Sequence, residues 1–393
     1  MSRPKIAAAV TIYTRYAHAQ HILDRFLEGY GWNSRHHLPP MDLVSLYVDQ
    51  LPPHDLSRQR AKRFPSMKIY PTISEALTRG GEKLAVDGVL LIGEHGNYPQ
   101  NEKGQTLYPR YEFFQQIVEV YRNSGRTAPV FNDKHLSWKW ELAKEMAETA
   151  KQLGFAFMAG SSLPVTWRLP PVDMPLGAEV QEVVCVGYGC DFHALEVIQC
   201  MVERRRGGET GVVAIHALRG DSVWEAMQAG SWEAGGWDPE LFEACLCRHH
   251  DLVPARKGFH HIYPSPNQLR SLVKTPEAFR FEYADGLKVT LLGMGGLTAG
   301  RSFTARLKGR KDPLSTLMYL SPREVCNFFS PLVNSIEKMF LTGKATYPVE
   351  RTLLTTGLLA AGQDSLWLGQ KRLETPHLAV RYQPTNDSTF WRS

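Results

Sequence analysis

The stretch spanning residues 128–160 constrains the fold of this chain more than any other segment. It reads as strand, loop, helix and strand: an apolar run stops at the polar cluster 132–135, and a helical pattern follows before the next apolar run. Ser137 is predicted to cap the helix, and Gly154 to end it. In such a unit the loop after the first strand opens at the carboxyl edge of a parallel sheet, where open α/β folds bind ligands. Lys134 in this loop is therefore a candidate for chemistry; the alternative is a solvated charge pair at a helix start.

The rest of the N-terminal part repeats this alternation of apolar strands and amphipathic helices. The predicted strands lie at 5–11, 41–48, 68–70 and 86–92, and the predicted helices at 17–27, 57–64, 74–79 and 111–121. Such alternation predicts a Rossmann-type, doubly wound parallel sheet that closes near Gly160.

The C-terminal part has a different pattern, which begins after a Pro-rich crossing at 164–175. Asp285-Gly286 between two apolar runs is a strong hairpin signal, and further strands follow a single helix at 193–206. This pattern predicts an α+β domain with an open, mostly antiparallel sheet. The predicted domains are 1–162 and 163–393, with the last helix able to pack back on the N-terminal domain. Residues 220–270 are an insertion to which the pattern assigns no elements.

Composition excludes several classes of protein. The 393 residues are 43% hydrophobic and 22% charged, with a net charge of +5, which is typical of a globular protein with a real core. The basic residues are scattered, so we expect no nucleic-acid partner. The first apolar run is short, so we expect neither a signal peptide nor a membrane span there. Six cysteines without a CxxC pair are most simply reduced thiols, so we expect a cytoplasmic protein.

Asp133-Lys134-His135-Leu136, the helix after it and Phe157-Met158-Ala159-Gly160 resemble the Glu-Lys-Pro segment of the glucose–fructose oxidoreductase / inositol dehydrogenase / MocA family. Asp133 stands for the Glu and His135 for the Pro. The resemblance implies an N-terminal dinucleotide-binding domain and a C-terminal substrate domain. It also implies that Lys134 lies beside the nicotinamide and the reacting carbinol.

Residues 189–196 resemble the family's second catalytic segment, in which a His just inside a helix accepts the hydroxyl proton. His193 occupies that position, and a neutral imidazole suits a general base near pH 7. The family's partner Asp falls on Gly189 here, so Asp191 or Glu196 takes its place in the prediction. The alternative for His193 is an ordinary capping or packed residue.

The first strand–helix turn is where a dinucleotide-binding chain carries glycines, which let backbone N–H groups approach the pyrophosphate. Aligned with the family, those glycines fall near Thr11, Tyr13 and Tyr16, so the fingerprint is absent. The two Tyr rings would fill space that the phosphates need. Thr14 and Arg15 can still hold a phosphate by side chain, or belong to a surface turn. We therefore predict weak or absent NAD(P) binding in the usual pose.

Two acidic residues complete the predicted cofactor site. Asp49 follows the second strand, at the position of an acid that hydrogen-bonds the adenosine ribose, which favours NAD over NADP. Asp133, in the position of the family's Glu, is the other.

Glu94 and His95 follow the fourth strand, where the resemblance implies a small Thr-Pro turn beside the nicotinamide. A carboxylate and an imidazole there suit acid–base work, with a polar loop as the alternative.

The His pairs 249–250 and 260–261 show no metal-ligand spacing, and we predict no metal site. Aromatic residues of the insertion can line a sugar-binding cleft or pack in a core, which is the default for Trp224, Trp232 and Trp237.

The resemblance implies an oxidoreductase that acts on a hydroxyl or carbonyl of a sugar or polyol with NAD or NADP. In this reading Lys134 polarises the carbinol, His193 moves the proton, and both face one cleft. A homo-oligomer through the open sheet face is expected. The alternative is a non-redox member that binds a carbohydrate-like ligand, or that acts as a lyase or hydrolase through Glu94, His95 and Lys134.

Overall fold

The computed structural model describes residues 3–253, 264–322 and 324–390, and the chain forms two compact units. The first unit comprises Met1–Ser162 and Ser321–Thr356, and the second comprises Leu163–Leu320 and Gly357–Arg392. The chain thus returns to the first unit over Ser321–Thr356, a segment that the predicted boundaries assign to the C-terminal domain.

The first unit is built on a six-stranded sheet in which all neighbouring strands are parallel. Its strands in chain order are β1 (Lys5–Val10), β4 (Asp42–Val48), β5 (Lys68–Tyr70), β6 (Gly88–Ile92), β7 (Val130–Asp133) and β8 (Phe157–Gly160). In space the order is β5-β4-β1-β6-β7-β8, so the direction of winding reverses between β1 and β6. The predicted doubly wound sheet is confirmed, and the reversal marks where such folds bind ligands.

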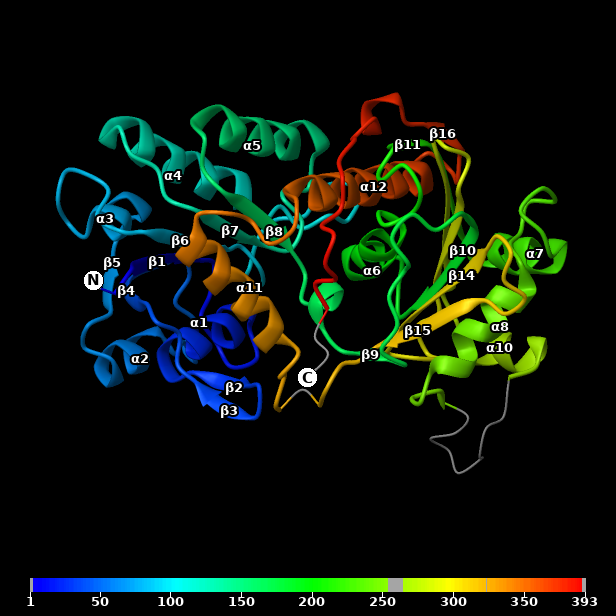
Figure 1. Cartoon of the computed structure of the whole chain (residues 1–393), viewed down its shortest axis with the longest axis horizontal. Helices are drawn as coiled ribbons and strands as arrows, with labels where there is room; N and C mark the ends of the chain where they lie inside the picture. The colour runs from blue at the N-terminus through cyan, green and yellow to red at the C-terminus, as the bar shows by residue number, and fades with distance from the viewer. Residues whose placement is uncertain (1–2, 254–263, 323, 391–393) are drawn as a thin grey trace. The chain divides into compact units, whose positions relative to one another are not determined.

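Helices cover both faces of this sheet, with α4 and α5 on one face and α1 and α2 on the other (Figure 1). The helices of the unit are α1 (His18–Glu28), α2 (Ser57–Arg63), α3 (Ile73–Thr78), α4 (Arg110–Ser124), α5 (Trp140–Leu153) and α11 (Phe329–Thr342). Every residue of β6 is buried, as expected for a strand covered on both faces.

Two local features of this unit differ from the sequence prediction. Ser137 is not the cap of α5, because the helix begins only at Trp140, and its N-cap is Lys139, which has an extended backbone and makes no side-chain cap hydrogen bond. A hairpin of β2 (Tyr30–Trp32) and β3 (Arg35–His37) was not predicted. Its strands are too short to show an alternating pattern.

The second unit is built on an eight-stranded open sheet of order β16-β11-β12-β13-β10-β14-β15-β9. Its strands are β9 (Arg168–Leu169), β10 (Val180–Gly187), β11 (Val212–Arg219), β12 (Glu277–Tyr283), β13 (Lys288–Gly293), β14 (Arg301–Leu307), β15 (Leu314–Met318) and β16 (Leu373–Glu374). Only the β10–β13 pair is parallel among these neighbours. The hairpin turns at Gly286, whose φ of 86° requires a glycine-like conformation. The predicted mixed, mostly antiparallel sheet is confirmed.

The insertion supplies three helices: α7 (Asp221–Ala229), α8 (Pro239–Arg248) and α10 (Pro266–Leu272). They lie on one side of this sheet, and α6 (Phe192–Val202) lies on the other (Figure 1). Trp224 and Trp237 are buried in the core between α7, α8 and the sheet, which confirms packing as their role. The chain's own helices thus cover a sheet face that the family resemblance would leave open for self-association. A homo-oligomer stays a prediction.

The remaining elements are α12 (Val349–Trp367), which contributes to both units, and the short turns η1 (Leu163–Val165) and η2 (Pro376–Leu378). Among the helices within the described residues, none has the length and apolar character needed to cross a membrane.

Candidate active site

Three non-glycine residues with a left-handed backbone follow three adjacent strands of the first sheet. Tyr16 comes after β1 with a φ of 67°, His95 after β6 with 67°, and Lys134 after β7 with 70°. This conformation costs roughly 1–2 kcal/mol for a residue with a side chain. Such strain typically marks a functional site, and here it gathers at the carboxyl edge beside the point of reversal.

The loop that carries Lys134 is held by its neighbours. The buried amide of Asn132 donates to the carbonyl oxygens of the next three residues at 3.2, 3.3 and 3.2 Å. The backbone N–H of Lys134 donates to Gly160 O at 3.1 Å, and that of Leu136 to Thr356 Oγ1 at 3.1 Å. These bonds fix the left-handed turn and therefore the direction in which Lys134 leaves the backbone.

Glu94 lies between two cations. Arg110 Nη2 forms an ion pair with Glu94 Oε2, and Lys134 Nζ lies 3.8 Å from Glu94 Oε1. Arg110 passes close to the end of β6 because Gly93 has no side chain: a Cβ there would lie 2.7 Å from Arg110 Cγ. Arg110 Nη1 also donates to His135 Nε2 at 3.0 Å. Only 1% of the Arg110 side chain, 11% of Lys134 and 15% of Glu94 is exposed.

The charges in this cluster decide which groups can carry protons. Burial alone would raise the pKa of Glu94, but Lys134 and Arg110 outweigh it and hold that pKa well below its usual value. Glu94 is therefore a fixed anion near pH 7, which argues against the predicted acid–base role and for a role as charge partner. Burial, and then the charge of Arg110, lowers the pKa of His135. Desolvation likewise lowers the pKa of His95, so both rings are neutral at pH 7.

Sequence analysis missed His18 and Arg110, and it placed Asn132 in the polar cluster without giving it a role. His18 is the first residue of α1, and its Nδ1 lies 2.8 Å from Asp133 Oδ2. The Asn directly before the Asp-Lys pair is a turn signal that could have been found. His18 and Arg110 join the site only through tertiary structure, so no local pattern indicates them.

The residues of the first turn do not present a phosphate-binding loop. Thr11 is buried, and its hydroxyl donates to Glu94 O at 2.7 Å. Tyr13 points into the unit, where its hydroxyl donates to Asp24 at 2.6 Å. The expectation that its ring fills the phosphate space is therefore wrong. Arg15 stacks on the ring of Tyr16 and donates to its hydroxyl at 2.9 Å. Thr14 is also buried, with its carbonyl oxygen accepting from the N–H of Ala17.

Asp49 is engaged by the chain itself. Its Oδ1 accepts from the Tyr47 hydroxyl at 2.7 Å and its Oδ2 from the Tyr98 hydroxyl at 2.6 Å. Burial, together with the bond to Asp49, raises the pKa of Tyr47 to about 12. The side chain of Gln50 makes two hydrogen bonds to the backbone of Asn97, at 2.9 and 3.0 Å. The loop after β6 is thus tied to the end of β4, and a ribose would have to share the carboxylate of Asp49 with both tyrosines. With no glycine in the first turn, the residues present do not fit a dinucleotide in its usual pose.

The predicted residues of the second segment lie in the second unit. Asp191 is the N-cap of α6: its Oδ1 accepts from Ala194 N at 2.9 Å, and its Oδ2 pairs with Arg301 at 2.6 Å. His193 is the second residue of α6 and is half-buried. Lys134 and His193 belong to different units, and the prediction that they face one cleft stays a prediction.

Of the two His pairs, 260–261 lies outside the described residues. His249 is buried, with Thr298 Oγ1 at 2.7 Å from its Nδ1 and Ser302 Oγ at 2.9 Å from its Nε2. Within the part of the chain that the structure describes, no group of three His, Cys, Asp or Glu side chains could hold a metal ion.

Comparison of the sequence with known families found no matching family model, and none of the curated proteins matches it. Solved structures do match along nearly the whole chain. GenD2 from gentamicin A biosynthesis, in complex with NAD, has a TM-score of 0.58 at 14% identity, over 95% of this chain and 97% of that chain. A myo-inositol dehydrogenase from Lactobacillus casei, in complex with NAD(H) and myo-inositol, has a TM-score of 0.52 at 10% identity, over 95% of this chain and 96% of that chain. A super-repressor mutant of Gal80p from Saccharomyces cerevisiae has a TM-score of 0.53 at 11% identity, over 97% of this chain and 100% of that chain.

At these identities the likeness concerns the fold, and it agrees with the order of elements in both units. The chain has the fold of the glucose–fructose oxidoreductase / inositol dehydrogenase / MocA family.

Proposed function

We propose that this chain is an enzyme that acts on a hydroxyl or carbonyl group of a sugar- or polyol-like small molecule. The observation that carries the proposal is Lys134: a largely buried cation on a strained, firmly held turn at the ligand-binding edge of the sheet. An ammonium fixed in this way can orient a substrate oxygen and stabilise negative charge that develops on it. The anion of Glu94 balances this cation and limits its movement.

The first version of this function is oxidation or reduction with NAD or NADP. Its support is the fold, which is shared with a myo-inositol dehydrogenase in complex with NAD(H) and myo-inositol, and with GenD2 in complex with NAD. In this version His193, with Asp191 at the start of its helix, accepts the hydroxyl proton.

The second version is acid–base chemistry without a dinucleotide, as in a lyase or hydrolase. The observation that favours it is Asp49, whose two oxygens accept from Tyr47 and Tyr98, beside a first turn without glycines. Losing the charge-assisted hydrogen bonds of a glycine-rich turn costs roughly 1.5–3 kcal/mol each, or about tenfold to hundredfold in affinity apiece.

Calorimetric titration with NAD, NADH, NADP and NADPH distinguishes the two versions. Low-micromolar binding supports the redox enzyme, whereas no binding at millimolar concentration supports the acid–base enzyme. Because the first turn has no glycine and Asp49 already accepts from two tyrosines, we expect weak or absent NAD(P) binding.

In either version we expect Lys134→Ala to lower turnover of a panel of polyols and keto-polyols by about a hundredfold or more. The matched control is Lys144→Ala, which removes an exposed lysine of α5. Equal activity in both variants would remove the basis of the proposal.

A further inference from the structure

His18 and Asp133 meet at the carboxyl edge of the first sheet although 115 positions separate them in the chain. The distance from His18 Nδ1 to Asp133 Oδ2 is 2.8 Å. Only 1% of the Asp133 side chain is exposed, compared with 15% of His18. The pair therefore has a buried carboxylate behind an imidazole that is still partly accessible.

The hydrogen bond sets the tautomer of the imidazole. A carboxylate oxygen only accepts, so Nδ1 of His18 carries the hydrogen. In a neutral ring Nε2 then has the lone pair and is the nitrogen that can take a proton. A carboxylate that fixes a histidine in this tautomer also stabilises the imidazolium that forms on proton transfer.

Neighbouring rings hold the imidazole in position. The ring of Phe329 packs edge-on against it, with centroids 4.9 Å apart at 89°, and the ring of His95 lies at 5.6 Å. Because Asp133 directly precedes Lys134, the bonds from Asn132 to their backbone carbonyl oxygens hold the turn from which both side chains extend. The carboxylate that orients the base thus leaves the same turn as the cation.

The position of His18 in the fold is also informative. In a dinucleotide-binding sheet the first turn of the helix after the first strand faces the pyrophosphate. Here the N-cap of α1 is Ala17, which offers no side-chain hydrogen bond, and the first helical residue is His18. An imidazole paired with a buried carboxylate at this place suits proton transfer rather than the holding of a phosphate.

We propose that His18, oriented by Asp133, accepts a proton from the substrate in the reaction at Lys134; this rests on the proposed function. For a keto-polyol, the C–H bond next to the carbonyl breaks and an Nε2–H bond forms on His18. The electron pair moves to the carbonyl oxygen, which becomes an enolate stabilised by the Lys134 ammonium. No oxidant or reductant is required, and in D₂O the reverse step returns deuterium to the carbon.

The charged and titratable groups that face His18 come from three elements. They are Asp133 of β7, Glu94 and His95 after β6, and His21 of its own helix. His21 offers a matched control, because it stacks on Phe329 from the same helix but takes no part in the pair with Asp133.

The first test is ¹⁵N NMR of the histidine rings at pH 7.5, with the His18 signals assigned by His18→Gln. We expect the Nδ1–H tautomer in the wild type and its loss in Asp133→Asn, where the amide can donate to Nδ1 instead. An Nε2–H tautomer in the wild type would overturn the proposal, whatever the activity.

The second test follows deuterium incorporation from D₂O into inosose, the ketone of myo-inositol, and into dihydroxyacetone. We expect His18→Gln and Asp133→Asn to lower the exchange rate by about 10²–10⁴-fold, and His21→Gln to leave it within about threefold. Thermal melting of each variant verifies that it is folded. A wild-type rate in His18→Gln, or no exchange by the wild type, overturns the role of His18. If Lys134→Ala also keeps the wild-type rate, the proposed function fails as well.

Discussion

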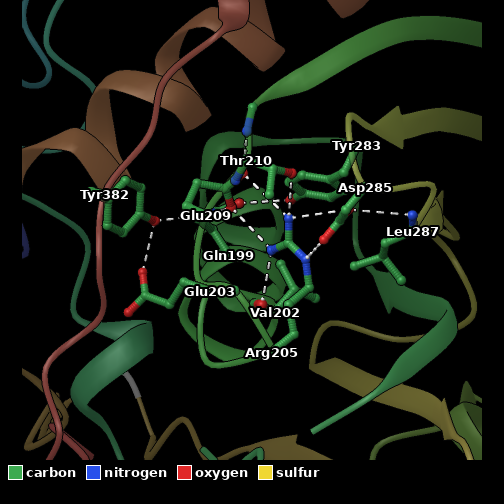
Figure 2. Close-up of polar contacts among 12 residues, drawn as sticks. Gln199, Val202, Glu203, Arg205, Glu209, Thr210, Tyr283, Asp285, Leu287 and Tyr382 are labelled. Atoms are coloured by element: carbon green, nitrogen blue, oxygen red, sulfur yellow. Dashed lines mark hydrogen bonds and ion pairs between the residues drawn. The ribbon is translucent and has the colours of Figure 1, made fainter. Parts of the chain in front are cut away.

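Each unit of the molecule buries an arginine beside a glutamate, and the two surroundings differ. In the second unit Arg205 bonds to Glu209, to Asp285 and to the backbone of Val202, within the network of Figure 2. In the first unit Arg110 shares Glu94 with Lys134 at the edge of a sheet. Around Arg205, the anions bond to that one arginine and to neighbouring polar groups. Around Arg110, by contrast, the Glu94 carboxylate also faces a second cation, Lys134.

The network around Arg205 joins distant parts of the second unit. Gln199 of α6 donates to Glu209 at 2.5 Å and to the Tyr382 hydroxyl at 2.8 Å, and accepts from Tyr283 of β12 at 2.6 Å. Tyr382 in turn donates to Glu203 at 2.8 Å (Figure 2). Its polar groups bond to one another and to backbone that belongs to the same unit. Such a satisfied network rigidifies and specifies a structure.

Backbone strain divides the two units in the same way. In the described part of the second unit, Gln370 is the only non-glycine residue with a left-handed φ. The first unit has such residues in its hairpin, at a helix end, near α11 and at the three strand ends: Tyr16, Asn33, Ser34, Arg79, His95, Lys134 and Cys326. The comparison teaches that buried charge alone does not mark a site. Charge together with strain at a strand end is what supports the proposed site at Lys134.

The largest expected effect is on stability, and it tests the network around Arg205. Arg205→Met leaves the buried carboxylate of Glu209 without its cation, so we expect a loss of about 3–5 kcal/mol in the free energy of unfolding. Arg110→Met should cost less, roughly 1–3 kcal/mol, because Lys134 still faces Glu94. Urea denaturation followed by circular dichroism measures both. A larger loss for Arg110→Met would reverse the comparison.

The sequence could predict the features that depend on local pattern, but not those that depend on contacts between distant parts of the chain. The strands and helices around Lys134 follow from periodicity, and the hairpin at Asp285-Gly286 follows from turn chemistry. The Lys134 turn itself was found because its polar residues directly follow an apolar strand. His18 and Arg110 were missed because their partners lie far along the chain and depend on which strands become neighbours. The helices of the insertion were missed because their apolar residues pack on a sheet that local pattern does not reveal.

The next effect is a dependence of stability on pH that should be stronger in the first unit. Burial, and then Arg25, lowers the pKa of His21 to about 4, and burial also lowers the pKa of His95 and His135. In the second unit, burial lowers the pKa of His216. A histidine whose folded pKa lies below its unfolded value of about 6.5 binds its proton more strongly when unfolded. Stability is therefore complete above about pH 6.5 and falls as the pH drops towards the folded pKa.

Hydrogen exchange at pH 7.5 and 5.5, corrected for intrinsic rates, separates the two units. We expect the free energy of opening to fall by about 1–3 kcal/mol for α1 and α4, after allowing for the partial exposure of these rings. The loss for α6 and β12 should be smaller. His21→Phe should remove part of the loss in α1. An equal loss in both units would show that the buried histidines do not account for it.

The smallest effect isolates the strain at a strand end from the contacts that the side chain makes. At an ordinary helical position such as Lys144, the glycine variant is less stable than the alanine variant by about 0.8–1 kcal/mol. At His95 the φ of 67° reverses this order, because alanine bears the left-handed penalty and glycine does not. We expect His95→Gly to be more stable than His95→Ala by about 1 kcal/mol, as measured by urea denaturation. Both variants lack the imidazole, so its contacts cancel from the difference. If alanine is the more stable at both positions, His95 is not strained, and the contrast between the two units would then depend on charge alone.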